Sequence, residues 1–306
     1  MTKMLTATQR LLRSGRRKKL YTLIFQYAIL AVVAFFMLYP LLWMFGASFN
    51  DGLPDGFSFI PRNFTWVGWL DALKAPGWGS AAGYSILRAL WNTLQYVIPH
   101  VLFMTFSSLL AAFVIARMHF KGKKIVFALV IGTLLMPATV FRIPMFTFWT
   151  SDVVSGLWEG SNVPFMAYFP LWAGAIFATN SFSIFMYIQF FRTIPRDLDE
   201  AAYIDGASKF QVLRYILMPI LKPTVLTVAL LLFIASYNDY QGPLIYRGDV
   251  DTYPLSLVLP MLGKDSTNTY AHVFSRSIVG VILPILIFFA AQKYFVGNDA
   301  DSGIKG

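Results

Sequence analysis

The sequence predicts an all-α, polytopic integral membrane protein with six transmembrane helices. Hydrophobic residues make up 57% of the 306 residues and charged residues only 13%, whereas charged residues approach a quarter of an ordinary soluble domain. A helix needs roughly 20 predominantly apolar residues to cross about 30 Å of hydrocarbon. Six runs satisfy this length, and they lie near residues 21–47, 90–116, 125–148, 163–191, 224–245 and 277–296.

The distribution of Lys and Arg residues supports this topology, because short, positively charged loops tend to stay on the cytoplasmic side of a membrane. Seven of the 25 basic residues lie in the N-terminal tail 1–20, four in segment 117–124 and five in segment 192–222. These segments precede the first, third and fifth spans, so both chain ends are expected in the cytoplasm. The asymmetry accounts for the net charge of +10 without a nucleic-acid partner, and the RRKK cluster predicts contact with anionic membrane lipids.

The six runs differ in how clearly each predicts one helix. The first, which contains TLIFQYAILAVV, is too long for a signal-peptide core and lacks a small-residue cleavage site. The basic string RMHFKGKK separates the second from the third. The fourth is interrupted by Pro164, Pro170 and Gly174, which predicts either a broken helix or an external segment leading into a shorter span. The fifth is a short run, VLTVALLLFIAS, followed by YNDYQGP. We expect a transmembrane domain over 21–297 and a tail over 298–306.

A polar segment, EAAYIDGASKFQVLRYILMPILKP at 200–223, separates the fourth and fifth spans. Pro195 and the acidic residues after it predict a helix start, since Pro fits the first turn and acidic groups suit the helix dipole. Gly206 predicts a left-handed C-terminal cap, and Ser208 predicts the start of a second helix that runs to Pro219. The expected geometry is a helix, a tight turn and a helix that lies on the membrane, with a small-residue surface at its Ala-Ala pair.

This segment resembles the EAA loop, E-A-A-x3-G-x9-I-x-L-P, of permease subunits from binding-protein-dependent ABC importers, with Met218 in place of the Leu. The longer string EAAYIDGAS resembles the carbohydrate branch of that family, the maltose-type permeases. The strings RMHFKGKK, LLMPATVFRIP and SYNDYQGPLIY extend the similarity over most of the chain from about residue 85. The resemblance implies that the loop, at about 195–222, couples the chain to an ATPase. The implied coupling residues are Glu200, Ala201, Ala202, Asp205, Gly206, Ile216 and Pro219.

The resemblance also implies the type I ABC importer permease fold, a place in the bacterial cytoplasmic (inner) membrane, and sugar import by alternating access. The implied partners are a second, homologous permease subunit, two ATP-binding subunits and an extracytoplasmic solute-binding protein. The chain lacks G-x-x-x-x-G-K-[ST], so ATP and Mg are expected on the partner ATPase subunits and no cofactor on this chain. No catalytic residue and no metal site is predicted, because there is no cysteine and the three histidines are far apart.

Polar side chains inside the spans are candidates for a substrate path, since they usually face a partner or a cavity. The densest cluster is YNDYQ, which combines aromatic rings with the amide and carboxylate groups that commonly bind sugars. The candidates are Tyr237, Asn238, Asp239, Tyr240, Gln241 and Asn92. The alternative is that Asn238 and Asp239 only cap a helix at the outer interface. Arg142 is expected near the outer surface, without a buried counter-charge.

The external segment between the last two spans, at about 241–270, is longer than a usual connection and rich in Pro, Tyr and Leu. We expect it to contact the binding protein through a tip formed by Tyr246, Arg247, Gly248 and Asp249. The alternative is that PLSLVLPML covers the outer ends of neighbouring helices. The resemblance implies a further ATPase contact in the C-terminal tail, at Gly303 and Lys305.

Several functional questions stay open on the sequence alone. An acidic oligosaccharide is one possible substrate, because the external Arg62, Arg88, Arg247 and Arg276 could face carboxylates. A secondary transporter or channel without an ATPase partner is the main alternative function, although neither inverted repeats nor mid-membrane ionisable residues are visible. A membrane-embedded enzyme or electron-transfer subunit would need paired histidines or a catalytic set, and neither is present.

Overall fold

The computed structural model describes residues 7–52, 59–73, 85–159, 163–262 and 270–296. Helices dominate this part of the chain, and its one isolated β-bridge joins Asn50 to Phe64. Among the described residues, five helices are long and apolar enough to cross a membrane: Lys19–Ala47, Ile86–Arg117, Phe165–Thr193, Lys209–Tyr237 and Tyr270–Ala291. If the bent pair of helices Lys123–Leu135 and Ala138–Trp149 is one span, the described residues contain six candidate spans. The predicted all-α membrane fold is confirmed.

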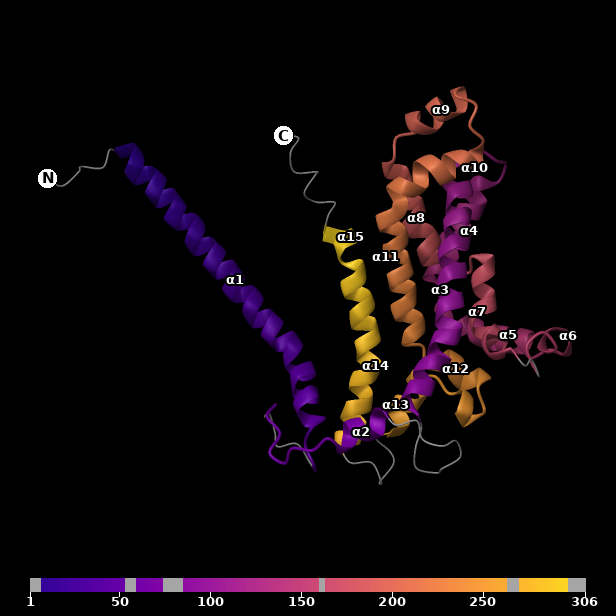
Figure 1. Cartoon of the computed structure of the whole chain (residues 1–306). Coiled ribbons are helices and arrows are strands. Elements are labelled where there is room, and N and C mark those ends of the chain that lie inside the picture. The colour runs from indigo at the N-terminus through magenta and orange to yellow at the C-terminus, as the bar shows by residue number, and fades with distance from the viewer. Residues whose placement is uncertain (1–6, 53–58, 74–84, 160–162, 263–269, 297–306) are drawn as a thin grey trace. The chain divides into compact units, whose positions relative to one another are not determined.

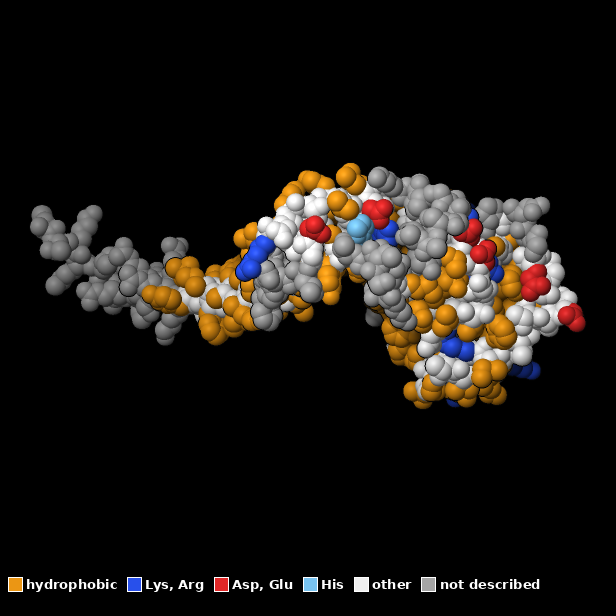
Figure 2. Space-filling model, turned by 90° about the horizontal axis from the view of Figure 1, so that it is seen from below, with side chains coloured by type: hydrophobic (Ala, Val, Ile, Leu, Met, Phe, Trp, Pro, Cys, Tyr) orange, Lys and Arg blue, Asp and Glu red, His pale blue; other side chains and the backbone are white. Residues whose placement is uncertain are grey.

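The chain divides into two compact units. The first contains α1 (Ala7–Ala47), most of α2 (Val67–Leu73) and the first turns of α14 (Tyr270–Ala291). The apolar side chains of α1 from Leu20 to Phe45 are mostly exposed, which suits a helix whose surroundings are lipid or another membrane chain. Exposed hydrophobic side chains also cover much of the surface drawn in Figure 2.

The second unit is a helical bundle built around α3 (Ile86–Arg117). Against it pack α8 (Ser181–Thr193) and α11 (Met218–Tyr237). The shared core includes the fully buried Tyr187 and Leu217. The remaining helices of the unit are α4 (Lys123–Leu135), α5 (Ala138–Trp149), α6 (Asp152–Ser155), α7 (Phe169–Trp172), α9 (Asp197–Ile204), α10 (Lys209–Gln211), α12 (Gln241–Tyr246), α13 (Leu255–Leu262) and α15 (Lys293–Val296), with the short η1 (Pro164–Tyr168), η2 (Ala173–Phe177), η3 (Val212–Leu217) and η4 (Val250–Thr252). Figure 1 shows α9 and α10 at one end of this bundle and α12 and α13 at the other.

The third predicted span is not one continuous helix. Its two halves, α4 and α5, meet at an angle of 100°. The bend lies at Met136 and Pro137, both of which have extended backbone angles. Proline disfavours the helical conformation of the residue before it and has no N–H to donate, so the helix ends at this point. The span predicted near 125–148 is therefore a bent pair of helices, and the sequence analysis did not predict the bend.

The fourth span is broken, as its proline and glycine residues predicted. The turns η1, α7 and η2 lead to Ala178, whose φ of 53° is unusual for a residue with a side chain. A regular helix resumes only at α8, where the Asn180 side chain accepts a hydrogen bond from the Ser183 backbone N–H at 2.8 Å. The N-cap therefore restarts the helix after the break.

The last two spans begin earlier than their apolar runs. The fifth extends over Lys209–Tyr237, because η3 continues without a break into α11, and α12 is a separate helix after it. The sixth, α14, occupies Tyr270–Ala291, whereas the apolar run predicted 277–296. Both helices begin with polar residues that a hydropathy criterion leaves out. The short helix α15 contacts the beginning of α11, because the Lys222 Nζ lies 5.4 Å from the centre of the Tyr294 ring.

Candidate functional site

The α9–α10 loop forms the helix, tight turn and helix that the sequence predicted. Gly206 has a φ of +84°, in the region that glycine adopts without strain. The Gly206 N–H donates to the Tyr203 carbonyl at 3.1 Å, and the Ala207 N–H donates to the Ala202 carbonyl at 2.9 Å. This is the Schellman arrangement, which satisfies the carbonyl groups at the end of α9.

The second helix of the loop starts with a capping box. The Ser208 side chain accepts from the Gln211 backbone N–H, and the Gln211 side chain accepts from the Ser208 backbone N–H at 2.7 Å. The helix does not end at Pro219 but continues into the fifth span. Figure 1 shows α10 turned across the end of α11, and the helix that starts at Lys209 is continuous with the fifth span.

A buried ion pair holds α9 on the bundle. The Arg117 Nη1 lies 3.2 Å from the Asp199 Oδ2, and the two side chains are 3% and 8% exposed. The Arg117 Nη2 also donates to the carbonyl oxygens of Phe191 at 2.8 Å and Ile194 at 2.9 Å. Burial raises the pKa of Asp199, while the positive charges of Arg117 and Arg196 act against that rise. Arg117 therefore joins the ends of α3 and α8 to the first turn of α9.

Sequence reasoning missed this pair. Asp199 fits the dipole of its helix and Arg117 belongs to a basic cytoplasmic segment, so neither residue by itself predicts a buried partner. The available signal was the i, i+3 spacing of Asp199 and Ala202, which lie on the same helix face and are both buried. A carboxylate on the buried face of a helix needs a partner, because burying an unpaired charge is costly.

The predicted coupling residues divide into an exposed set and a packed set. Glu200, Ala201, Asp205 and Gly206 are exposed, whereas Ala202 is only 7% exposed. The expected small-residue surface therefore contains Ala201 and not Ala202. Of the two residues at the far end of the motif, Ile216 is half-buried and Pro219 is exposed.

Large apolar side chains are also exposed in the same segment, 195–222. The exposed fractions are 86% for Ile204, 62% for Phe210 and 67% for Tyr215. Such a concentration of exposed apolar groups beside acidic ones is typical of a protein interaction surface.

The predicted substrate-path residues lie at the other end of the bundle, and several are engaged within the protein. The Tyr237 hydroxyl donates to the Gly280 carbonyl, which joins α11 to α14. The buried Asn92 amide donates to the carbonyl oxygens of Asp251 at 3.0 Å and Tyr253 at 3.1 Å. Asn92 thus anchors η4 and the residue that follows it. The Asn238 amide donates to the Ile234 carbonyl of its own helix at 2.8 Å.

The remaining three residues of YNDYQ face outward or toward α5. Tyr240 and Gln241 are exposed. The Asp239 Oδ1 accepts from the Gly242 N–H at 3.1 Å and lies 3.8 Å from the Arg142 Nη2. Arg142 was expected to have no buried counter-charge, and its acidic neighbour Asp239 is indeed partly exposed, at 35%.

The described part of the segment after the fifth span, residues 241–262, contains α12, η4 and α13. In α13, Leu255, Leu257 and Val258 are buried, and this helix packs against α3. The Thr93 hydroxyl accepts from the Leu255 N–H at 2.9 Å. The string PLSLVLPML therefore packs on the neighbouring α3, as the alternative to a binding-protein contact predicted. Residues 263–269 of the segment, and the tail residues Gly303 and Lys305, lie outside the described residues.

The predicted tip contains two half-buried residues, Tyr246 and Arg247, and two exposed residues. The Arg247 guanidinium lies over the rings of Trp158 at 5.6 Å and Tyr168 at 5.3 Å, and burial lowers its pKa. Gly248 and Asp249 are exposed, and the Asp249 side chain caps η4. Gly248 has no left-handed φ, so the turn at the tip does not depend on glycine.

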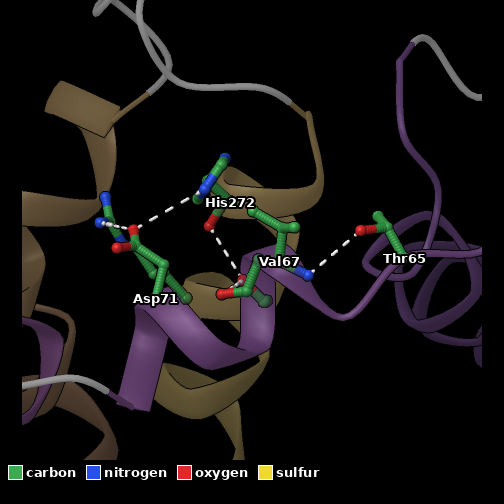
Figure 3. A network of polar contacts seen from close by, with 7 residues as sticks. Thr65, Val67, Asp71 and His272 are labelled. Atoms are coloured by element: carbon green, nitrogen blue, oxygen red, sulfur yellow. Dashed lines mark hydrogen bonds and ion pairs between the residues drawn. The ribbon is translucent and has the colours of Figure 1, made fainter.

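A separate polar network lies in the first unit, where α14 begins. The Arg276 Nη2 lies 2.6 Å from the Asp71 Oδ2, and the His272 Nε2 lies 3.8 Å from the same oxygen (Figure 3). The Ser275 hydroxyl donates to the Gly68 carbonyl at 2.8 Å. The ion pair of Arg276 with Asp71 holds α2 on α14. Because the Arg276 side chain is only 4% exposed, it is not available to a substrate carboxylate.

Comparison with known proteins identifies the family. Residues 104–297 match the binding-protein-dependent transport system inner membrane component family. The chain belongs to this family. It is therefore a multi-pass inner membrane protein that works with a binding protein, and the predicted family is confirmed.

Similar permeases cover almost the whole chain. The trehalose/maltose transport system permease protein MalG of Thermococcus litoralis is 27% identical over 90% of this chain and 94% of its own length. The lactose transport system permease protein LacG of Rhizobium radiobacter is 26% identical over 89% of this chain and 93% of its own. The maltose/maltodextrin transport system permease protein MalG of Salmonella typhimurium is 25% identical over 95% of this chain and 98% of its own length. All three are transport subunits, and this permease is not an enzyme by itself.

A solved structure shares the fold. A chain of a bacterial ABC transporter involved in the import of the acidic polysaccharide alginate superposes with a TM-score of 0.70 at 21% identity, over 96% of this permease and 100% of that chain. The same kind of transporter in complex with an alginate pentasaccharide-bound periplasmic protein gives a TM-score of 0.59 at 18% identity. The predicted type I ABC importer permease fold is confirmed.

Proposed function

We propose that this permease is the transmembrane subunit of an ATP-driven importer that moves a sugar or oligosaccharide into the cytoplasm by alternating access. The observation that carries the proposal is the α9–α10 loop, which presents an exposed acidic and apolar surface on a turn fixed by Gly206. The sugar class rests on the relatives named for maltose, trehalose and lactose. Both chain ends lie in the cytoplasm in this proposal, in agreement with the charge distribution.

The partners in the proposal are a second permease chain, two ATP-binding subunits that hold ATP and Mg, and an external binding protein. The exposed face of α9, with Glu200 and Ala201, enters a groove of the ATPase. The buried Arg117–Asp199 pair passes the movement of α9 to α3 and α8. The fifth span moves with the loop because α10 and α11 are continuous through η3. The tail with Gly303 and Lys305 makes a further ATPase contact.

Reconstitution tests the function. In liposomes that contain this permease, its partner chains and its binding protein, we expect sugar and binding protein together to stimulate ATP hydrolysis several-fold, and uptake to require ATP. The control omits the binding protein, which should reduce hydrolysis to the basal rate. Uptake driven by an ion gradient without ATP would instead establish the secondary-transporter alternative.

The exposed tip of the external segment gives a second prediction. A Cβ built at Gly248 meets no atom within 4 Å, so Gly248→Trp adds bulk at the tip without strain in the fold. If the tip contacts the binding protein, uptake at limiting binding protein should fall several-fold while basal ATP hydrolysis stays unchanged.

Gly156→Trp is the matched control for this variant, because Gly156 is exposed directly after α6, outside the segment, and its Cβ site is equally open. Equal uptake by the Gly248→Trp variant and the unmodified transporter at every binding-protein concentration would exclude the tip contact.

A further inference from the structure

A small cavity of about 230 Å³ lies in the second unit, at the end of the bundle where α11 leads into α12. Its wall comes from α3, α5, the broken part of the fourth span and α12. The chemically important lining residues are His100, Phe141, Arg142, Trp149, Asp239 and Tyr246. His100, Arg142 and Asp239 contribute polar or charged groups, and the other three contribute aromatic rings. This composition is typical of small-molecule sites.

The charged pair in this cavity is incompletely satisfied. The Arg142 Nη2 and the Asp239 Oδ1 are 3.8 Å apart, longer than the roughly 2.7–2.9 Å of a charge-assisted hydrogen bond. The Arg142 Nε is buried and has no hydrogen-bond partner among the described residues. Buried donors are normally paired, so a donor that the protein itself does not satisfy is available to a bound molecule. The two side chains are 34% and 35% exposed, so a ligand can reach them.

The other polar contacts fix the orientation of the site. The Asp239 Oδ1 accepts from the Gly242 N–H, which turns the carboxylate at the start of α12. The His100 Nδ1 lies 3.2 Å from the Leu171 carbonyl oxygen. Since a carbonyl can only accept, Nδ1 donates the hydrogen bond and the imidazole ring is held in place.

The charge balance of the cavity indicates the ligand class. Arg142 and Asp239 contribute one positive and one negative charge, so a carboxylate placed beside Arg142 would also face Asp239 and be repelled. An uncharged sugar ring suits the pair better. Its hydroxyl groups accept from the guanidinium and donate to the carboxylate, and its C–H faces pack against aromatic rings. The volume lies below the about 300–1,000 Å³ of sites for larger ligands, so it suits one ring.

We propose that this cavity binds one uncharged sugar ring of the transported substrate through Arg142 and Asp239. The proposal rests on the proposed sugar-import function and deepens it. It also differs from what the alginate transporter would imply, because an acidic ring is disfavoured by Asp239.

The test uses two variants that change the cavity charge in opposite directions. Arg142→Gln leaves the net charge at the pair negative, and Asp239→Asn leaves it positive. In the reconstituted complex, stimulation of ATP hydrolysis is measured with a panel of neutral oligosaccharides and uronate oligosaccharides of the same length. We expect both variants to raise the half-saturating concentration of the neutral sugar by roughly tenfold, as the loss of a charged hydrogen bond predicts.

The ratio of uronate to neutral response separates binding from a structural role. It should rise for Asp239→Asn and fall for Arg142→Gln, whereas loss of a merely structural ion pair would change both sugars equally. Arg192→Gln is the control, since this exposed arginine lies over the Phe127 ring and away from the cavity. Should a charge variant fail to assemble, Met145→Trp fills the cavity without changing its charge and should reduce the neutral-sugar response.

Two outcomes would overturn the inference while leaving sugar import intact. One is an unmodified transporter that responds to uronates and not to neutral sugars. The other is that the variants respond to both sugar classes like the unmodified transporter. An unmodified transporter that no sugar stimulates would instead reject the proposed function itself.

Discussion

Replacement of Arg117 by methionine is expected to destabilise the permease by about 3–5 kcal/mol, the usual effect of removing one partner of a buried ion pair. The variant leaves the buried Asp199 carboxylate without its counter-charge, and it removes the donor that serves the carbonyl groups of Phe191 and Ile194. Because α9 would then be loosely held, we also expect sugar-stimulated ATP hydrolysis to fall more than basal hydrolysis. Thermal unfolding in detergent and ATPase assays measure the two effects.

A double variant distinguishes the cost of the unpaired charge from the loss of the arginine itself. Arg117→Met combined with Asp199→Leu removes both charges and should recover much of the stability, since an apolar pair of similar volume can replace a buried ion pair. It should recover less of the coupling, because the carbonyl groups at the end of α8 still lack their donor. Arg192→Met is the matched control, as an exposed arginine on α8. A single Arg117 variant as stable and as well coupled as this control would contradict the positioning role.

The features that the sequence predicted well are those with a local cause. The left-handed turn at Gly206 and the start of the helix after Ser208 each depend on residues within a few positions, so the chemistry of those residues is sufficient. The break in the fourth span was also predicted, because its proline and glycine residues are local signals. In contrast, averaging hydropathy over a whole span hid the effect of Pro137, which bends the third span by 100°.

The features that sequence reasoning missed depend on contacts between distant segments. Arg117 and Asp199 lie on different helices, and only the packing of α3 against α8 brings them together. The same holds for Arg142 and Asp239, which meet because α5 turns at the bend. Asn92 was predicted to line a substrate path, but its amide group holds the segment that contains Asp251. A polar residue in a span indicates a partner, but not whether that partner is a ligand or the chain itself.

Charge reversal at Glu200, or a β-branched residue at Gly206, is expected to uncouple ATP hydrolysis from transport while the chain still inserts in the membrane. Glu200 is exposed on α9 beside the apolar Ile204, so Glu200→Lys changes the interaction surface without disturbing the core. Gly206 has a φ of +84°, and a side chain there costs about 1–2 kcal/mol in the left-handed conformation, with β-branched residues the most strained. Gly206→Val would therefore shift the turn that aims α9. We expect sugar uptake to fall at least tenfold in each variant.

The controls follow from the same geometry. Asp197→Lys reverses an exposed charge in the first turn of the same helix, outside the coupling set, and should retain most of the uptake. Gly206→Asn keeps a residue that tolerates the left-handed region and should be milder than Gly206→Val. Measured together, uptake and ATP hydrolysis distinguish the outcomes, since uncoupling lowers uptake per ATP hydrolysed whereas misfolding removes both along with the assembled complex. Normal uptake by both Glu200→Lys and Gly206→Val would show that the α9–α10 loop does not couple this permease to an ATPase, and the exposed apolar side chains around it would then need another partner.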